Sequence, residues 1–186
     1  MDQGTELYRR YVSGDDTAAE ALIGMYKDGL MLYLNRYTEN IFLAEELMEE
    51  TFFRLMTRRP FFLGRSGFKT WLFAIARNLA LDHLRRSART SELTDGELAR
   101  AEAAGADLER QYLRREQAVR LHNAIKKLPP DYSRVLYLIY FEDFSNAETA
   151  RVLGKTRRQV ENLSYRAKQA LRRQLETEGF AYEGYD

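Results

Sequence analysis

The chain has 186 residues, enough for one or two small domains, and 45% of them are hydrophobic, enough to form buried cores. It contains no cysteine, which excludes disulfides, thiolate metal sites and thiol nucleophiles. The formal net charge is +1, and neither a long apolar run nor a signal-like N-terminus is visible, so we expect a cytoplasmic protein without membrane-spanning segments.

Apolar residues recur at helical spacing along most of the chain, which predicts an all-α fold. Residues 5–12 predict a short helix that ends near Gly14. A longer helix follows, with Asp16 or Thr17 as its N-cap, and its aromatic-rich stripe is interpreted as core. Asn40 is expected to cap the third helix.

The third helix begins with a strongly acidic stretch. From Glu39 to Glu50 there are five acidic residues and no basic one. Acidic side chains near a helix N-terminus complement the helix dipole, so a solvated face explains this stretch as well as a docking surface for a basic partner does.

Residues 58–67 predict a loop, because they contain one proline and two glycines. The loop presents Phe61 and Phe62 beside arginines. Exposed aromatic rings suit unpaired bases, although these two could also tuck beneath the domain.

Residues 68–89 predict a helix with an apolar packing side around Trp71 and a polar, basic stripe on another side. Between residues 65 and 90 six basic residues accompany one acidic residue, Asp82, which gives a net charge of +5. A basic helix face of this kind indicates a nucleic-acid footprint.

Residues 91–110 differ in composition: six acidic residues, two arginines and many small residues predict a flexible acidic linker. The expected organisation is two small helical domains, at residues 1–90 and 111–178, joined by this linker and followed by a tail at residues 179–186.

In the second domain, the apolar run VLYLIYF is interpreted as a buried central helix rather than a strand, because it follows Pro129, Pro130 and Asp131, with Asp131 as the N-cap. The helix-turn-helix comes next. Its first helix, residues 146–153, is expected to be capped by Ser145 or Asn146.

Gly154 suits the left-handed turn between the two helices, and Thr156 caps the second one. Leu153, Val160 and Leu163 are placed inward, where they close a small core.

The second helix of this motif concentrates positive charge. Residues 155–173 contain seven basic residues and one acidic residue, Glu161, for a net of +6. Such a helix fits the DNA major groove, with its first residues at base edges and its later ones at phosphates. An ordinary amphipathic helix with a solvated basic face is the alternative.

Two separate segments resemble one protein family. AEELMEETFFRLM, followed by GFKTWLFAIARNLALDHLRR, is similar to the second conserved domain of bacterial RNA polymerase sigma factors of the extracytoplasmic-function (ECF) group in the sigma-70 family. LPPDYSRVLYLIYFEDFSNAETARVLGKTRRQVENLSYRAKQALRR resembles their fourth domain. The resemblance therefore implies a sigma factor that binds core RNA polymerase, recognises promoters and opens the minus-ten region for transcription initiation.

The resemblance also implies roles for particular residues. Those implied to dock on the β′ clamp coiled coil of the polymerase are Glu45, Glu46, Leu47, Glu49, Glu50 and Phe53. Those implied to bind and open the minus-ten element are Ser66, Phe68, Lys69, Trp71, Arg77, Asn78, Asp82, Arg85 and Arg86. Those implied to bind the minus-thirty-five element are Thr156, Arg157, Arg158, Glu161, Asn162 and Arg166. Further implied partners are the β flap and an anti-sigma factor, with no cofactor and no metal.

Thr149 and Glu161 depart from the family pattern, and Leu163 and Ser164 interchange its common Arg-Leu order. A branched apolar residue is usual where Thr149 stands, so the helix packing is expected to be slightly looser there. A basic residue is common where Glu161 stands. Glu161 could accept a hydrogen bond from a cytosine amino group, or it could pair with Arg157 or Arg158.

Other classes of function explain the sequence less well. An enzyme is not expected, because His83 and His122 lie in different domains without metal-ligand spacing, and Asp82 lacks the partner acid that a nuclease needs. A helix-turn-helix regulator that is not a polymerase subunit explains the second domain alone. A protein-interaction adaptor leaves both basic faces without a role.

Overall fold

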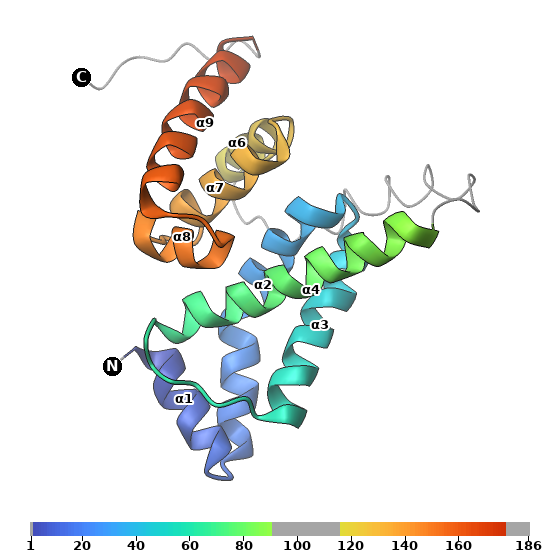
Figure 1. Ribbon diagram of the computed structural model, residues 1–186, viewed down its shortest axis with the longest axis vertical. Coiled ribbons are helices and arrows are strands. Elements are labelled where there is room, and N and C mark those ends of the chain that lie inside the picture. Colours follow the sequence, from blue (N-terminus) through green and yellow to red (C-terminus); the bar gives the residue numbers. More distant parts are fainter. Residues whose placement is uncertain (1, 91–115, 178–186) are drawn as a thin grey trace.

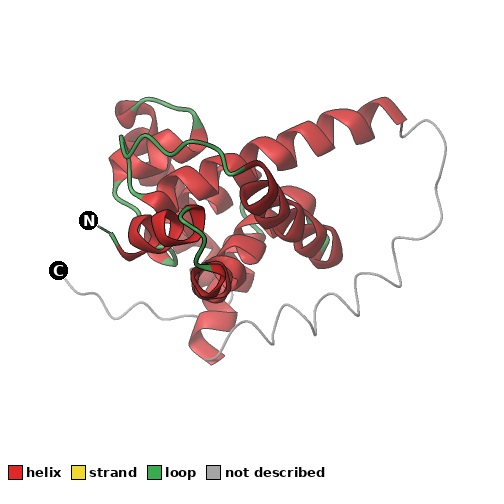
Figure 2. Cartoon of the chain, turned by 90° about the horizontal axis from the view of Figure 1, so that it is seen from below, coloured by secondary structure: helices red, strands yellow, loops and turns green. Residues whose placement is uncertain are grey.

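A computed structural model describes residues 2–90 and 116–177, and these residues form helices and loops without any strand (Figure 2). The helices are α1 (Gln3–Val12), α2 (Asp16–Thr38), α3 (Ile41–Arg58), α4 (Phe68–Thr90), α6 (Glu116–Lys126), α7 (Pro130–Tyr140), α8 (Asn146–Leu153) and α9 (Arg157–Thr177). The predicted all-α class is therefore confirmed. The expected linker at residues 91–110 and tail at residues 179–186 lie outside the described residues.

Side-chain caps set where the first helices begin. Asp2 accepts a hydrogen bond from the Thr5 amide at 2.8 Å, so α1 starts earlier than the sequence pattern predicts. Asp15, rather than Asp16 or Thr17, caps α2. The Asn40 carboxamide accepts from two amides of the first turn of α3, as expected.

Helices α1 to α4, here called the N-terminal group, pack around α2 (Figure 1). The predicted aromatic stripe of α2 is in the core: Tyr26 and Tyr33 are buried beside fully buried Leu22 and Leu30. Met25 is the exception, because 40% of its surface is exposed. Burial of this apolar surface is the main force that holds the four helices together.

Helices α6 to α9, the C-terminal group, pack around α7, whose residues Val135 to Leu138 are buried as expected. Asp131 is not the N-cap of α7. The helix begins at Pro130, and Pro129 occupies the cap position without a side-chain hydrogen bond. Proline at the first helical position has no amide to satisfy, so Asp131 is available to pair with Arg134 instead.

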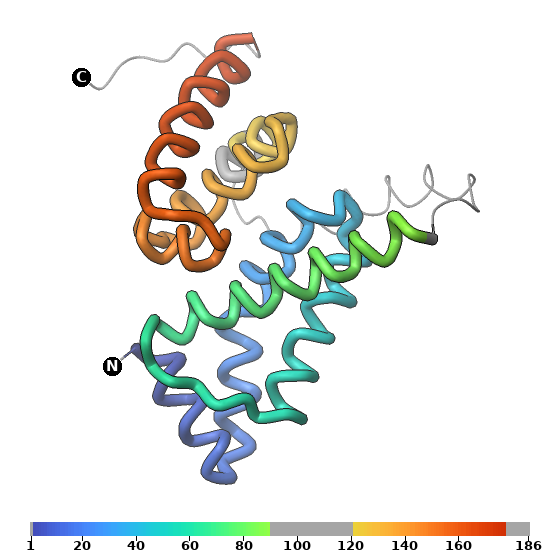
Figure 3. Tube along the Cα trace, viewed as in Figure 1, coloured from blue at the N-terminus to red at the C-terminus, as the bar shows by residue number. Residues whose placement is uncertain are grey.

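The two groups pack directly on each other: α2 and α4 contact α7 and α8 (Figures 1 and 3). Tyr33 stacks on Tyr137 with ring centroids 6.4 Å apart, and Arg134 lies 3.9 Å above the Tyr37 ring. The Arg36 guanidinium contacts the ring of His122, and both side chains are buried. The described helices therefore share one continuous core.

Candidate nucleic-acid interface

The helix-turn-helix is built by two reciprocal caps around a glycine turn. Ser145 accepts from the Glu148 amide while the Glu148 carboxylate accepts from the Ser145 amide, which fixes the start of α8. Gly154 ends α8 with a φ of 61°, a conformation in which a side chain is strained. The predictions for Ser145 and Gly154 are confirmed.

A second reciprocal cap starts α9. The Thr156 hydroxyl accepts from the Gln159 amide at 3.2 Å, and the Gln159 side chain accepts from the Thr156 amide at 2.8 Å. Val160 and Leu163 are buried as predicted. This register turns the opposite side of α9 to solvent, where the exposed predicted minus-thirty-five residues lie: Arg157, Arg158, Glu161, Asn162 and Arg166.

Glu161 pairs with the first arginine of its helix. Its Oε1 lies 2.8 Å from Arg157 Nε, one turn away on the exposed surface. Arg158 has no ion-pair partner within the described residues. Of the two roles open to Glu161, the structure contains the ion pair.

Helix α4 carries the other basic face. Asn78, Asp82, Arg85 and Arg86 are exposed along its outer side, and Arg85 pairs with Asp82 at 3.0 Å. The packing side holds Leu72 and Leu79, as expected from the pattern. It also holds Phe73, which the sequence did not single out and which is fully buried.

The predicted minus-ten residues do not all reach the surface. Phe68 is fully buried, with its ring 5.2 to 5.9 Å from those of Tyr8, Tyr26, Phe62 and Trp71. Phe68 therefore lies in the core, where it packs beneath Trp71 and Phe62. Ser66, Lys69, Trp71 and Arg77 are partly exposed.

The two loop phenylalanines differ in exposure. Phe61 is 84% exposed. Phe62 packs beneath it on Trp71, with centroids 5.0 Å apart.

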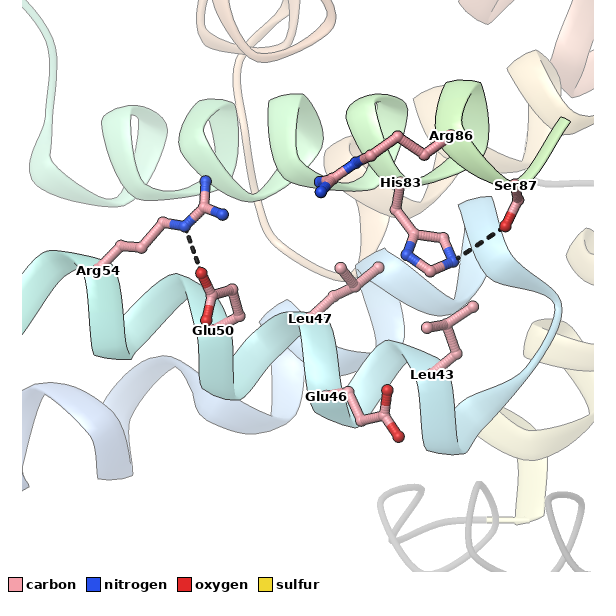
Figure 4. A pocket seen from close by; sticks show the side chains of 8 residues that line it. All are labelled: Leu43, Glu46, Leu47, Glu50, Arg54, His83, Arg86 and Ser87. Carbon is pink, nitrogen blue, oxygen red and sulfur yellow. Dashed lines mark hydrogen bonds and ion pairs between the residues drawn. The ribbon is translucent and has the colours of Figure 1, made fainter. Parts of the chain in front are cut away.

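The acidic helix α3 presents Glu46, Glu49 and Phe53 to solvent, whereas Leu47 is buried and Glu50 pairs with Arg54. An open groove runs between α3 and α4 (Figure 4). It is lined by Leu43, Glu46, Leu47, Glu50, Arg54, His83, Arg86 and Ser87. The groove thus brings residues predicted for docking beside Arg86, which was predicted for DNA.

A second groove lies between α7 and α9 in the C-terminal group. Its lining is Tyr132, Tyr165, Arg166, Gln169, Ala170 and Arg173. Of these residues, only Arg166 belongs to a predicted site. The signal that points to the other residues of this groove is Tyr165, a large aromatic residue that is exposed and that the helix-turn-helix core does not require.

Within residues 2–90 and 116–177 no three or more His, Cys, Asp or Glu side chains gather in a way that could hold a metal ion. Among the same residues no helix is both long and apolar enough to cross a membrane.

Comparison with known proteins agrees with this geometry. Residues 22–90 match the family model "Sigma-70 region 2", and residues 118–171 match "Sigma-70, region 4". The chain is 30% identical over 184 residues to the RNA polymerase sigma-H factor of Pseudomonas aeruginosa, covering 95% of both proteins. It is 34% identical over 172 residues to the ECF RNA polymerase sigma factor BldN of Streptomyces coelicolor, of which it spans 65%.

Two solved structures have a similar fold. CnrH, solved in complex with the cytosolic domain of CnrY, matches with a TM-score of 0.62 at 23% identity, over 95% of this chain and 99% of that one. RpoE of Bartonella quintana, solved with the anti-sigma factor NepR, gives 0.61 at 19% identity, over 84% and 96%.

Fold, paired basic faces and sequence matches together define a promoter-recognition class of DNA-binding protein. Within that class, this chain belongs to the sigma-70 family of RNA polymerase sigma factors, and its relatives include named ECF factors.

Proposed function

We propose that this chain binds core RNA polymerase, directs it to particular promoters and opens the minus-ten region. The observation that carries the proposal is the presence of two basic helix faces, on α4 and α9, in a chain that also presents an acidic docking helix. A sigma factor uses all three. The proposal keeps residues 1–90 and 111–178 as the two domains, residues 91–110 as the linker and residues 179–186 as the tail.

The docking surface is one stripe of α3. Phe42, Glu46, Glu49 and Phe53 are exposed and follow one another at spacings of four, three and four, so they share one helix face. Phe42 and Phe53 are 40% and 62% exposed. Aromatic ends with acidic residues between them suit a partner helix that is apolar and basic, as proposed for the β′ clamp coiled coil.

The groove between α7 and α9 is proposed to bind the β flap. Tyr132 and Tyr165 provide apolar surface there, and Arg166 and Arg173 flank them. Aromatic and arginine side chains are the residues enriched at protein interfaces. Since Arg166 also belongs to the proposed minus-thirty-five set, the two contacts adjoin on α9.

Opening of the minus-ten element is proposed for α4 and the loop before it. Melting requires a surface that binds unpaired bases better than stacked ones. Exposed Phe61 offers a ring for stacking, partly exposed Trp71 lies nearby on packed Phe62, and the arginines of α4 provide contacts to phosphates. The protein would act by binding alone, without catalysis, cofactor or metal, in the bacterial cytoplasm.

A helix-turn-helix regulator that acts apart from the polymerase is not favoured. It would use α8 and α9 but leave the α3 stripe and the α4 face without a partner. The anti-sigma factor that accompanies RpoE of Bartonella quintana further suggests control by such a factor, which we propose here as well.

Run-off transcription tests the proposed function. Promoters are first selected from a random DNA library with the reconstituted holoenzyme, and then transcribed by core polymerase with and without this chain. We expect a discrete product only when the chain is present. Core enzyme that yields the same products without it would refute the proposal.

A further inference from the structure

Helix α1 lies alongside the loop that joins α3 to α4, here called the α3–α4 loop (residues 59–67; Figure 1). Two tyrosines of α1 donate hydrogen bonds to backbone carbonyls where this loop begins. Tyr8 Oη lies 2.7 Å from the Pro60 carbonyl oxygen, and Tyr11 Oη lies 2.8 Å from that of Met56, in the last turn of α3. The Arg59 guanidinium lies 5.0 Å from the centre of the Tyr11 ring.

The residue that precedes α1 holds the other end of the same loop. Asp2 Oδ2 accepts a hydrogen bond from the Phe68 amide at 3.1 Å, where α4 begins, and Asp2 Oδ1 accepts from the Thr5 amide at 2.8 Å. One carboxylate therefore caps the first turns of two helices. At Gly4, α1 approaches α4 so closely that an added Cβ would lie 2.8 Å from the Phe68 ring. The α3–α4 loop is thus fastened to the N-terminal segment at both of its ends.

The two tyrosines are buried at the place where they hold the loop. Tyr8 and Tyr11 are 2% and 7% exposed, so water has little access to their hydrogen bonds. Burial raises the pKa of Tyr8 to about 12, and its phenol therefore remains a donor. The Tyr8 ring also packs edge-on against Trp71, at 5.5 Å between centroids. Trp71 in turn packs against Phe62, the neighbour of Phe61 in the loop.

The side chains that the α3–α4 loop presents to solvent contrast with this fixed backbone. Phe61 is 84% exposed and Leu63 is 63% exposed. A segment that is already ordered loses less conformational entropy when it binds than a mobile one does. A loop that is held in place should therefore stack Phe61 on an unpaired base more strongly than a loose loop would.

We infer that Tyr8 and Tyr11 are positioning residues for promoter opening, which hold the α3–α4 loop through their hydroxyl groups so that Phe61 meets an unpaired base. The inference rests on the proposed function. Both tyrosines act through Phe61, without touching DNA. Loss of either hydroxyl should reduce opening by roughly two- to tenfold, the factor that corresponds to one hydrogen bond.

Conservative substitutions separate the hydroxyl groups from the packing of the rings. Tyr8→Phe and Tyr11→Phe, made singly and together, remove the hydrogen bonds and keep the aromatic contacts. Thr51→Val is the matched control, because it removes a buried hydroxyl of the same group of helices that donates to the Leu47 carbonyl within α3 at 2.6 Å. It should lower the melting temperature about as much as each single tyrosine variant does, but leave the loop fastened.

The first measurement is spectroscopic and needs no DNA. Trp71 is the only tryptophan of the chain, and it lies against both Tyr8 and Phe62. Quenching of its fluorescence by acrylamide in the full-length protein should rise in the tyrosine variants, because a loosened loop leaves Trp71 more exposed. Quenching in Thr51→Val should equal that of the parent. Unchanged quenching in the double tyrosine variant would overturn the inference.

The second measurement is a double-mutant cycle on promoter opening by the holoenzyme, followed by permanganate reactivity of unpaired thymines. Phe61→Ala removes the ring that the tyrosines are inferred to hold. Changes that act through one ring are not additive, so Tyr8→Phe with Tyr11→Phe should reduce opening in the parent but hardly further in the Phe61→Ala protein. Full additivity would indicate a merely structural role for the tyrosines and would overturn the inference. Thr51→Val should open promoters as the parent does.

The parent protein distinguishes failure of this inference from failure of the proposed function. If parent holoenzyme opens and transcribes the selected promoters and the tyrosine variants do so equally well, the inference alone is wrong. If parent holoenzyme opens none of them, the proposed function is wrong, and the role of Tyr8 and Tyr11 at promoters is refuted with it.

Discussion

The α9 and α4 faces contain similar amounts of positive charge but differ in what covers them. Arg157, Arg158 and Arg166 of α9 point to solvent, and the nearest acid, Glu161, lies on the same helix. On α4, Lys69 is bound to Glu142 of the other group and Arg77 lies against the turn at Gly154. The number of basic residues therefore indicates how strongly a face could bind DNA. Packing between residues far apart in the sequence decides how many of those basic residues are exposed.

The difference suits two kinds of contact. Duplex DNA presents base edges and phosphates without rearrangement, so an exposed helix can meet it at once. Unpaired bases become available only after melting, which costs free energy. Of the α4 face, Asn78, Asp82, Arg85 and Arg86 are already exposed, whereas Lys69 is paired with Glu142.

The largest effect is expected from loss of polymerase binding, because both basic faces are proposed to act on promoters together with core polymerase. Glu46→Lys combined with Glu49→Lys puts two positive charges in the middle of the α3 stripe, where a basic partner is proposed. We expect core polymerase binding to weaken by at least about 100-fold, because like charges across an interface repel. Co-purification with core enzyme measures it.

Glu20→Lys, an exposed charge reversal on α2, is the control for this pair and should leave binding intact. Helical content and melting temperature should match the parent in both variants, since these glutamates are exposed. Retained co-purification of the double variant would rule out the proposed docking stripe.

The next prediction distinguishes the role of the α9 face from that of the α4 face. Arg157→Ala with Arg158→Ala should weaken duplex binding at the upstream element by about 1–3 kcal/mol per lost base contact. Asn78→Ala should impair opening more than duplex binding, because Asn78 lies on the α4 face. Gel-shift titration reports the first effect and permanganate reactivity of unpaired thymines the second.

Arg172→Ala is the control for charge removal, as it lies late on α9 and pairs with Glu176 at 3.0 Å. It should reduce affinity slightly and equally for all sequences. Equal defects of the Arg157 and Asn78 variants in both assays would contradict the division of labour between the faces.

Glu161→Gln examines the exposed ion pair on α9. Loss of this ion pair frees Arg157 and should raise the affinity of the protein for mixed-sequence duplex DNA by roughly two- to fivefold, because exposed ion pairs contribute about 0.2–1 kcal/mol. If Glu161 instead reads a cytosine, selectivity at one promoter position falls and general affinity stays level. Binding to a panel of single-base promoter variants distinguishes the two results.

A buried threonine in the core beneath each face extends the comparison from DNA binding to stability. Thr149 is fully buried, and its hydroxyl has no hydrogen-bond partner among the described residues. Thr149→Val should raise the free energy of unfolding by about 1 kcal/mol, because an unsatisfied hydroxyl is replaced by a methyl group. Urea unfolding followed by circular dichroism measures it.

Thr51 is the matched comparison in the N-terminal group. It is equally buried, but its hydroxyl donates to the Leu47 carbonyl at 2.6 Å. Thr51→Val should therefore lower the free energy of unfolding by about 1 kcal/mol. A fall for Thr149→Val as well would mean that the Thr149 hydroxyl is hydrogen-bonded in solution.

Much of the fold could be predicted because its signals are local. The helical period, the cap at Ser145, the turn at Gly154 and the inward positions of Val160 and Leu163 all depend on residues a few positions apart. The wrong caps show the limit of this reasoning. Asp15, Asp16 and Thr17 are all good cap residues, and only the backbone path after α1 selects Asp15.

The candidate site divides in the same way. Sequence by itself determined that α4 and α9 carry positive faces, that α3 is acidic and that two family segments occur in order, since residue spacing sets which side chains share a helix face. Tertiary structure alone decided that Phe68 is buried, that α3 and α4 form one groove and that Glu142 binds Lys69, 73 positions away. Contacts over that distance depend on how whole helices pack, which no local pattern encodes.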